Sequence, residues 1–153
     1  DPNMELLFKE DDYKLMLVKT LAERLAEAAA EKVHEDIRKK IWGYAPDEKL
    51  TKRELLNEEY QGIRPAVGYP SLPDISVNFL LDELLDMKQI GISLTENGMM
   101  QPHASVCGLM FAHPASRYFS VGKIGTDQLT DYAKRRGVTV DVMRKYLAAN
   151  LQD

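Results

Sequence analysis

The sequence has little of what would hold a metal, cross a membrane or bind nucleic acid. One cysteine and three histidines in 153 residues exclude an internal disulfide and argue against a structural zinc site, which needs closely spaced ligands. No apolar run approaches the roughly 20 residues of a membrane span, and no signal-peptide pattern opens the chain. The net charge of −4 disfavours a nucleic-acid partner, because phosphate binding depends on clustered Lys and Arg. We therefore expect a cytoplasmic protein.

The overall composition is typical of a globular protein. Hydrophobic residues make up 44% of the chain and charged residues 29%, which fits one domain with a modest core. The sequence shows no internal repeat, low-complexity segment or linker, so we expect residues 1–153 to form a single domain.

A long helix is expected to begin at Asp11 or Asp12 and to end before Gly43. Its apolar residues recur at steps of three and four, which predicts one apolar face that packs on a sheet. These residues are Val18, Leu21, Leu25, Ala28, Ala29, Val33, Ile37 and Ile41. The opposite side carries a row of glutamates, and Lys39 is placed to pair with Glu35.

The rest of the chain predicts shorter helices around a sheet. A capping-box pattern at Thr51–Glu54 opens one of them. The helices are expected over 52–59, 76–90, 127–136 and 139–149. The strands are expected over 92–95, 99–101, 104–112 and 118–121, with the hairpin signal Asn97-Gly98 between the first two. The fold class is therefore α+β: an antiparallel β meander packed against a long N-terminal helix, with smaller flanking helices.

The stretch Arg64–Pro70 is the main candidate for a binding loop. Its two prolines fix φ and push the residues before them toward extended geometry, which leaves the loop little freedom. Gly68 can adopt a positive φ or let another group approach the backbone closely. Arg64 presents a planar fork that suits a carboxylate or a phosphate. From these seven residues alone, a rigid surface turn with a solvated arginine is the simpler interpretation.

Three further motifs accompany this loop in the sequence. They are Trp42–Pro46, Asn57–Ile63 and His113–Phe119. Together with the loop, and in this order and spacing, they resemble the activation domain of cobalamin-dependent methionine synthase, which binds S-adenosylmethionine. The resemblance extends from about Tyr13 to Leu151.

The resemblance implies a ligand site around the Arg64 loop. In the family this loop contacts S-adenosylmethionine, whose carboxylate Arg64 could hold with two parallel hydrogen bonds. The backbone of Ala66 could read the adenine edge. Gly68 and Tyr69 belong to the same loop, and its prolines would hold the Tyr69 ring at the mouth of the cleft.

Tyr118 and Phe119 fall on the second ligand-binding position of the family. An aromatic face beside a sulfonium gains about 0.5–2 kcal/mol of cation–π stabilisation, depending on desolvation. Alternation along an extended segment places the two side chains on opposite faces. We therefore expect Tyr118 to face the ligand and Phe119 to contribute its backbone, whereas the simpler interpretation is that both residues pack in a hairpin.

The resemblance also implies two acidic residues in the site and a further part of the site that this chain lacks. Glu27 and Glu58 match acidic positions of the family's cleft and could pair with the ligand's ammonium, although a solvated surface position explains each equally well. The family's domain has further chain on its amino-terminal side, with an aspartate that engages the ligand's amino group. Since the resemblance begins almost at residue 1, we expect a carboxy-terminal portion of such a domain with an incomplete cleft.

The function that the resemblance implies is reactivation of a methyltransferase, 5-methyltetrahydrofolate–homocysteine methyltransferase. In the family, flavodoxin or a flavoprotein reductase reduces cob(II)alamin held by a neighbouring module, and this domain presents S-adenosylmethionine for its methylation. No residue is expected to act as a catalyst or metal ligand, because the chemistry belongs to cobalt and the sulfonium, and the chain alone is not expected to be active. The alternative is a non-catalytic scaffold that docks on a corrinoid protein or redox partner.

Overall fold

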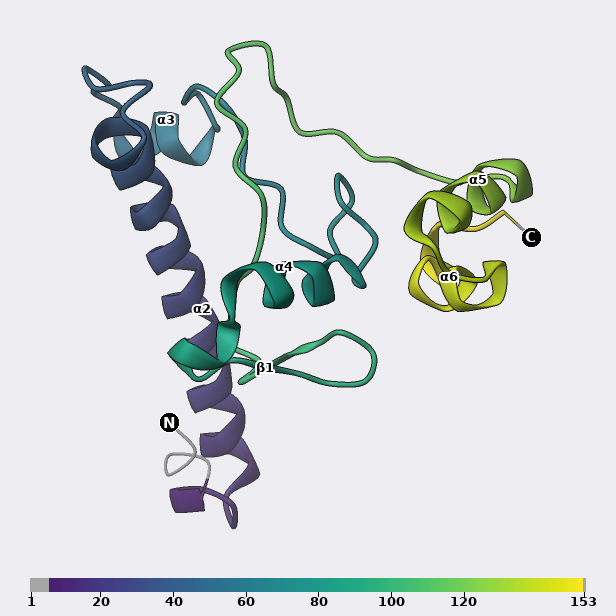
Figure 1. The fold of residues 1–153 in the computed structure, drawn as a ribbon. Helices are drawn as coiled ribbons and strands as arrows, with labels where there is room; N and C mark the ends of the chain where they lie inside the picture. Colours follow the sequence, from purple (N-terminus) through teal and green to yellow (C-terminus); the bar gives the residue numbers. More distant parts are fainter. Residues whose placement is uncertain (1–5, 153) are drawn as a thin grey trace. The chain divides into compact units, whose positions relative to one another are not determined.

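The computed structural model describes residues 6–152, which Figure 1 draws as a ribbon. The chain clusters into two compact units. The first unit comprises residues 1–60 and 101–106, and the second comprises residues 61–100 and 107–153. Across the described residues, no helix is both long enough and apolar enough to cross a membrane.

The first unit is built on the long helix α2 (Asp12–Asp36) (Figure 1). Asp11 caps its start, because its carboxylate accepts a hydrogen bond of 3.0 Å from an amide of the first turn. The helix continues as a π-helical turn, Ile37–Ile41. Gly43 then leaves the helix with a φ of +72°. The expected long helix and its stop at the glycine are confirmed.

The buried side of α2 and of the π-helical turn that continues it differs from the expected apolar face. Leu21 and Leu25 are 55% and 70% exposed, and Val33 and Ile41 are exposed as well. The sheltered side carries small and polar residues spaced four apart, namely Ala22, Ala26, Ala30, His34 and Arg38. The expectation was wrong because a hydrophobicity pattern gives most weight to large apolar side chains, whereas alanines and a paired arginine occupy the sheltered side.

A buried ion pair holds the end of this helical segment. The Arg38 guanidinium donates two hydrogen bonds of 2.7 Å to the two carboxylate oxygens of Glu48. The Tyr60 ring lies 4.4 Å from the guanidinium carbon and meets the buried His34 ring edge to face. Burial alone would lower the pKa of Arg38, but the hydrogen bond and charge of Glu48 outweigh it and raise the pKa. The Arg38 guanidinium therefore stays charged inside the first unit.

The short helix α3 (Lys52–Leu56) begins with the expected capping box. The Thr51 hydroxyl accepts from the Glu54 amide at 3.3 Å, and the Glu54 carboxylate accepts from the Thr51 amide at 2.6 Å. The helix is shorter than expected, since Glu58 takes a left-handed φ of +57°.

Several shorter helices belong to the second unit. They are α4 (Val77–Leu85), η2 (Met87–Ile90), α5 (Thr126–Arg136), α6 (Val140–Tyr146) and η3 (Ala148–Asn150). Asp86, with a φ of +50°, separates α4 from η2, so the single helix expected over 76–90 is divided in two. Gly137, in the left-handed conformation, ends α5 at Arg136, where the sequence predicted the end of this helix.

The sheet is smaller than the meander that we expected. Within residues 6–152 it consists of β1 (Ser93–Leu94) and β2 (Met100–Gln101), joined by the expected turn in which Gly98 has a φ of +77°. The segments 104–112 and 118–121 are extended but make only isolated bridges or none. The α+β class and the long N-terminal helix are confirmed, and the meander is reduced to one hairpin plus these extended segments.

Two apolar clusters stabilise the second unit. One lies between α5 and α6 and is centred on the buried residues Leu129, Ala133, Met143 and Leu147. The other gathers Val67, Leu81 and Met87, against which Cys107 packs. Burial raises the pKa of the Cys107 thiol, which makes the nucleophilic thiolate less accessible.

A polar network joins α5 to the start of α4. The carboxylate of Asp74, only 3% exposed, accepts from the Ser76 hydroxyl at 2.6 Å and from the Tyr132 hydroxyl at 2.7 Å. The Arg136 guanidinium donates to the Ser76 hydroxyl at 2.9 Å. Burial, followed by the hydrogen bond to Asp74, raises the pKa of Tyr132 to about 12.

The raised pKa of Tyr132 predicts a pH-dependent stability. The folded state keeps the phenol proton to higher pH than the unfolded chain, so the stabilisation is complete below pH 10 and is lost as the pH rises toward 12. We expect the free energy of unfolding, measured by urea denaturation, to fall across this window. In Tyr132→Phe the fall should be smaller, and an equal fall in both proteins would contradict the assignment.

Candidate functional site

The site is built on a short antiparallel ladder between residues 63–67 and 107–111. Ile63 and Phe111 exchange backbone hydrogen bonds of 2.9 and 3.0 Å. The Leu109 amide donates to the Pro65 carbonyl at 3.0 Å, and Val67 donates to the Cys107 carbonyl at 3.0 Å. Pro65 accepts a hydrogen bond from Leu109 but has no N–H with which to donate one. The ladder is therefore interrupted at Pro65, and isolated bridges form where we expected a continuous strand.

Two glycines allow these segments to approach closely. A Cβ at Gly62, whose φ is +86°, would lie 2.2 Å from the Phe111 carbonyl oxygen. A Cβ at Gly108 would lie 2.6 Å from the Pro65 carbonyl oxygen. Sequence reasoning considered only Gly68 in this region, because a close backbone approach depends on a partner segment that is remote in sequence.

Beyond the ladder the chain makes a tight turn over residues 68–72. The Gly68 amide donates to the Leu72 carbonyl at 2.8 Å, and the Leu72 amide donates to the Tyr69 carbonyl at 2.8 Å. Gly68 has a positive φ of +87°, which is one of the two roles that the sequence left open for it. The proline-rich loop is therefore fixed by hydrogen bonds as well as by its prolines.

The aromatic segment 118–121 lies along this loop. The Arg64 amide donates to the Tyr118 hydroxyl at 2.8 Å, and the Val121 amide donates to the Pro70 carbonyl at 2.9 Å. The Ser71 hydroxyl bonds to both backbone groups of Phe119. The two stretches that sequence reasoning singled out, 54 residues apart at Arg64 and Tyr118, are thus in direct contact.

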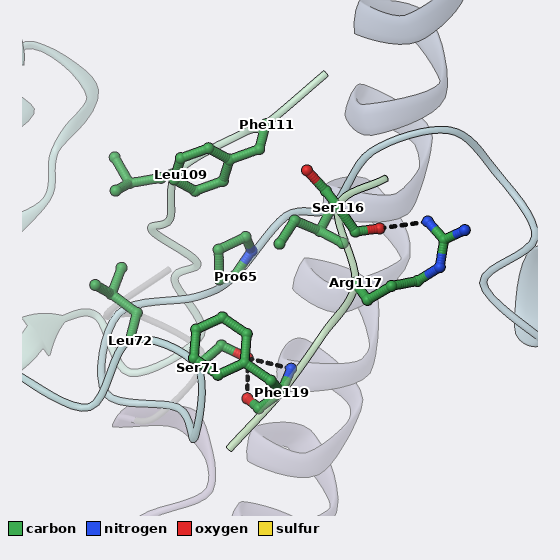
Figure 2. Close-up of a pocket in the computed structure, with 9 residues that line it drawn as sticks. Pro65, Ser71, Leu72, Leu109, Phe111, Ser116, Arg117 and Phe119 are labelled. Atoms are coloured by element: carbon green, nitrogen blue, oxygen red, sulfur yellow. Dashed lines mark hydrogen bonds between the residues drawn. The ribbon is translucent and has the colours of Figure 1, made fainter. Parts of the chain in front are cut away.

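A pocket of about 330 Å³ opens between the ladder and the aromatic segment (Figure 2). It is lined by Ile63, Pro65, Ser71, Leu72, Leu109, Phe111, Ser116, Arg117 and Phe119. Its walls are mostly apolar. Arg117 also belongs to the lining residues, and its guanidinium donates to the Pro114 and Ser116 carbonyls at 2.8 and 2.6 Å. Its volume lies at the lower end of the range for small-molecule sites.

Comparison with known proteins identifies the family. Residues 3–137 match the family described as "Vitamin B12 dependent methionine synthase, activation domain". The chain belongs to this family. A solved structure of the MetH reactivation domain bound to AdoHcy is similar, with a TM-score of 0.93 and 47% sequence identity. The match covers 99% of the present chain and 48% of that one, so our chain spans about half the length of this relative.

Some of the residues that the sequence of this activation-domain chain singled out line the pocket, and others do not. Of the two aromatic residues singled out in the sequence, the Phe119 ring lines the pocket, whereas the Tyr118 hydroxyl is engaged by the Arg64 backbone. Buried and half-buried residues alternate from Ile63 to Val67. Ile63 and Pro65 belong to the set that lines the pocket, and Arg64 and Ala66 do not.

The other candidate residues of this activation-domain chain are not among those that line the pocket. Tyr69 lies in the tight turn and is 58% exposed. Glu27, on α2, and Glu58, which follows α3, are exposed residues of the first unit. A ligand contact by any of the candidates stays a prediction.

Sequence reasoning missed several residues that line the pocket. Leu109 and Phe111 lie in the segment 104–112 that we expected to be a strand, and Ser71 follows the loop motif by one position. Arg117 falls inside the motif His113–Phe119, so that motif was the one available signal for it. Leu109, Phe111 and Ser71 could be recognised as pocket residues only in the structure, where the ladder brings their segments together.

Proposed function

We propose that this chain is an S-adenosylmethionine-binding part of a methionine synthase activation domain and presents the methyl donor for reductive methylation of cob(II)alamin. The observation that carries the proposal is the direct contact between the Arg64 loop and the aromatic segment Tyr118–Phe119, on a chain of this family. The similar MetH domain, which is 47% identical, binds AdoHcy, the demethylated form of the same ligand.

The residues present fit such a ligand. S-adenosylmethionine carries a carboxylate, an ammonium, a sulfonium and a flat adenine, and supplies the methyl group when bound. Arg64 suits the carboxylate, because its guanidinium fork can make two charge-assisted hydrogen bonds. The apolar walls formed by Pro65, Leu109 and Phe119 suit a nucleoside ring. The chain's contribution would be orientation of the ligand through these contacts.

The wider role in reactivation extends the same proposal. We propose that cobalamin is held by a neighbouring module, that flavodoxin or a flavoprotein reductase supplies the electron, and that the process takes place in the cytoplasm. We also propose that residues 1–153 act as one domain, the carboxy-terminal portion of the activation domain. Family membership supports the cobalamin module most directly. The alternative of a scaffold without ligand has no specific observation in its favour.

Calorimetric titration with S-adenosylhomocysteine tests the proposal. We expect saturable binding with one ligand per chain, weaker than that of a protein spanning the full length of the MetH relative, because this chain covers 48% of it. Adenosine, which lacks the amino-acid group, should bind more weakly still, since it has no carboxylate for Arg64. Absence of binding both in this chain and in a longer protein containing it would overturn the proposal and favour the scaffold.

A further inference from the structure

One hydroxyl group fixes the aromatic wall of the pocket. The Ser71 hydroxyl accepts a hydrogen bond of 3.1 Å from the Phe119 amide and donates to the Phe119 carbonyl (Figure 2). Ser71 therefore bonds with both backbone groups of a residue 48 positions away. A serine side chain used in this way replaces the backbone pairing that a regular strand would provide.

The Phe119 side chain depends on this backbone contact. Its ring lines the pocket but is 61% exposed, so packing alone constrains it weakly. Neighbouring bonds hold the same segment independently of Ser71, since Val121 donates to the Pro70 carbonyl at 2.9 Å and Tyr118 accepts from the Arg64 amide at 2.8 Å. Loss of the Ser71 hydroxyl should therefore leave the segment attached and free the backbone of Phe119 alone.

We propose that Ser71 is a positioning residue for the ligand, which acts by holding the Phe119 backbone so that the ring forms one wall of the pocket. This inference rests on the proposed function, because it assigns a role within the same site. A wall that is fixed before binding does not have to be ordered by the ligand, and preorganisation of this kind raises affinity. Ser71 itself need not contact the ligand.

Three serine variants test the role of this hydroxyl. Ser71→Ala removes both bonds to Phe119, Ser71→Thr retains a hydroxyl, and Ser105→Ala is the control, since its hydroxyl donates to the Pro102 carbonyl at 2.7 Å and lies outside the candidate site. For S-adenosylhomocysteine we expect about tenfold weaker binding by Ser71→Ala, recovery to within about threefold in Ser71→Thr, and no change in Ser105→Ala. The Tm of Ser71→Ala should stay close to that of the unmodified chain.

A ligand-free measurement separates this inference from the proposed function. Amide hydrogen exchange at Phe119 should become at least tenfold faster in Ser71→Ala, because its acceptor is lost, while exchange at Val121 should not change. Unchanged exchange at Phe119, or unchanged affinity in Ser71→Ala, would overturn the positioning role. If the unmodified chain and the longer protein both fail to bind S-adenosylhomocysteine, the proposed function fails and the role of Ser71 in ligand positioning fails with it, whatever the exchange result.

Discussion

Replacement of Arg64 by alanine is expected to reduce S-adenosylhomocysteine binding to the limit of detection. If the guanidinium holds the ligand's carboxylate, its removal leaves that charge without a partner, at a cost of roughly 2–5 kcal/mol. This corresponds to a loss of affinity of about 30-fold to several thousandfold. Calorimetric titration of the variant, with its Tm measured in parallel, checks the result.

Further arginine variants make the Arg64 experiment specific. Arg64→Lys keeps the charge but loses the planar fork, so we expect an intermediate affinity. Arg135→Ala is the control, because this exposed arginine pairs with the neighbouring Asp131 at 2.9 Å, lies over the Tyr132 ring and is not among the candidate ligand residues. Normal binding by Arg64→Ala together with a large loss in Arg117→Ala would assign the carboxylate to the arginine that lines the pocket and contradict the role of Arg64.

The largest expected loss of stability follows replacement of Gly62 by alanine. The new Cβ would lie 2.2 Å from the Phe111 carbonyl oxygen, which is backbone and cannot rotate away. The left-handed φ costs about 1–2 kcal/mol in any L-residue, and overpacking adds about 1–3 kcal/mol. We therefore expect the free energy of unfolding, from urea denaturation, to fall by roughly 2–5 kcal/mol.

Gly122→Ala is the matched control for this steric effect. Gly122 has a similar φ of +70°, but a Cβ there would meet nothing within 4 Å in the described part of the chain. It should therefore show only the conformational cost of about 1–2 kcal/mol. Equal stability of the Gly62 and Gly122 variants would mean that the segments 63–67 and 107–111 do not pair as closely as the structure shows.

Local signals in the sequence predicted much of the fold. The capping box at Thr51, the hairpin at Asn97-Gly98 and the end of α5 at Arg136 all occur where they were expected. Each depends on a few adjacent residues whose preferences are set by backbone sterics or one short hydrogen bond. Such signals need no knowledge of the rest of the chain.

Features that depend on distant partners could not be predicted in this way. The sheltered side of the helical segment 12–41 ends at Arg38, which is buried because it pairs with Glu48, and a pattern of apolar residues does not detect such a pair. The ladder at Pro65 is interrupted by a missing donor, and the close approach at Gly62 depends on Phe111, 49 positions later. The motifs identified the two stretches of the candidate site, while the pocket itself required the structure.

Residue-resolved mapping of the ligand tests the central claim most directly. Titration of the isotopically labelled chain with S-adenosylhomocysteine, followed by NMR of the backbone amides, reports which residues the ligand reaches. We predict saturable shifts concentrated at Ala66, Gly68, Tyr118 and Phe119, and their disappearance in Arg64→Ala. Saturable shifts confined to residues outside 63–72 and 107–121 would contradict the claim that the proline-rich loop and the aromatic segment together bind the methyl donor.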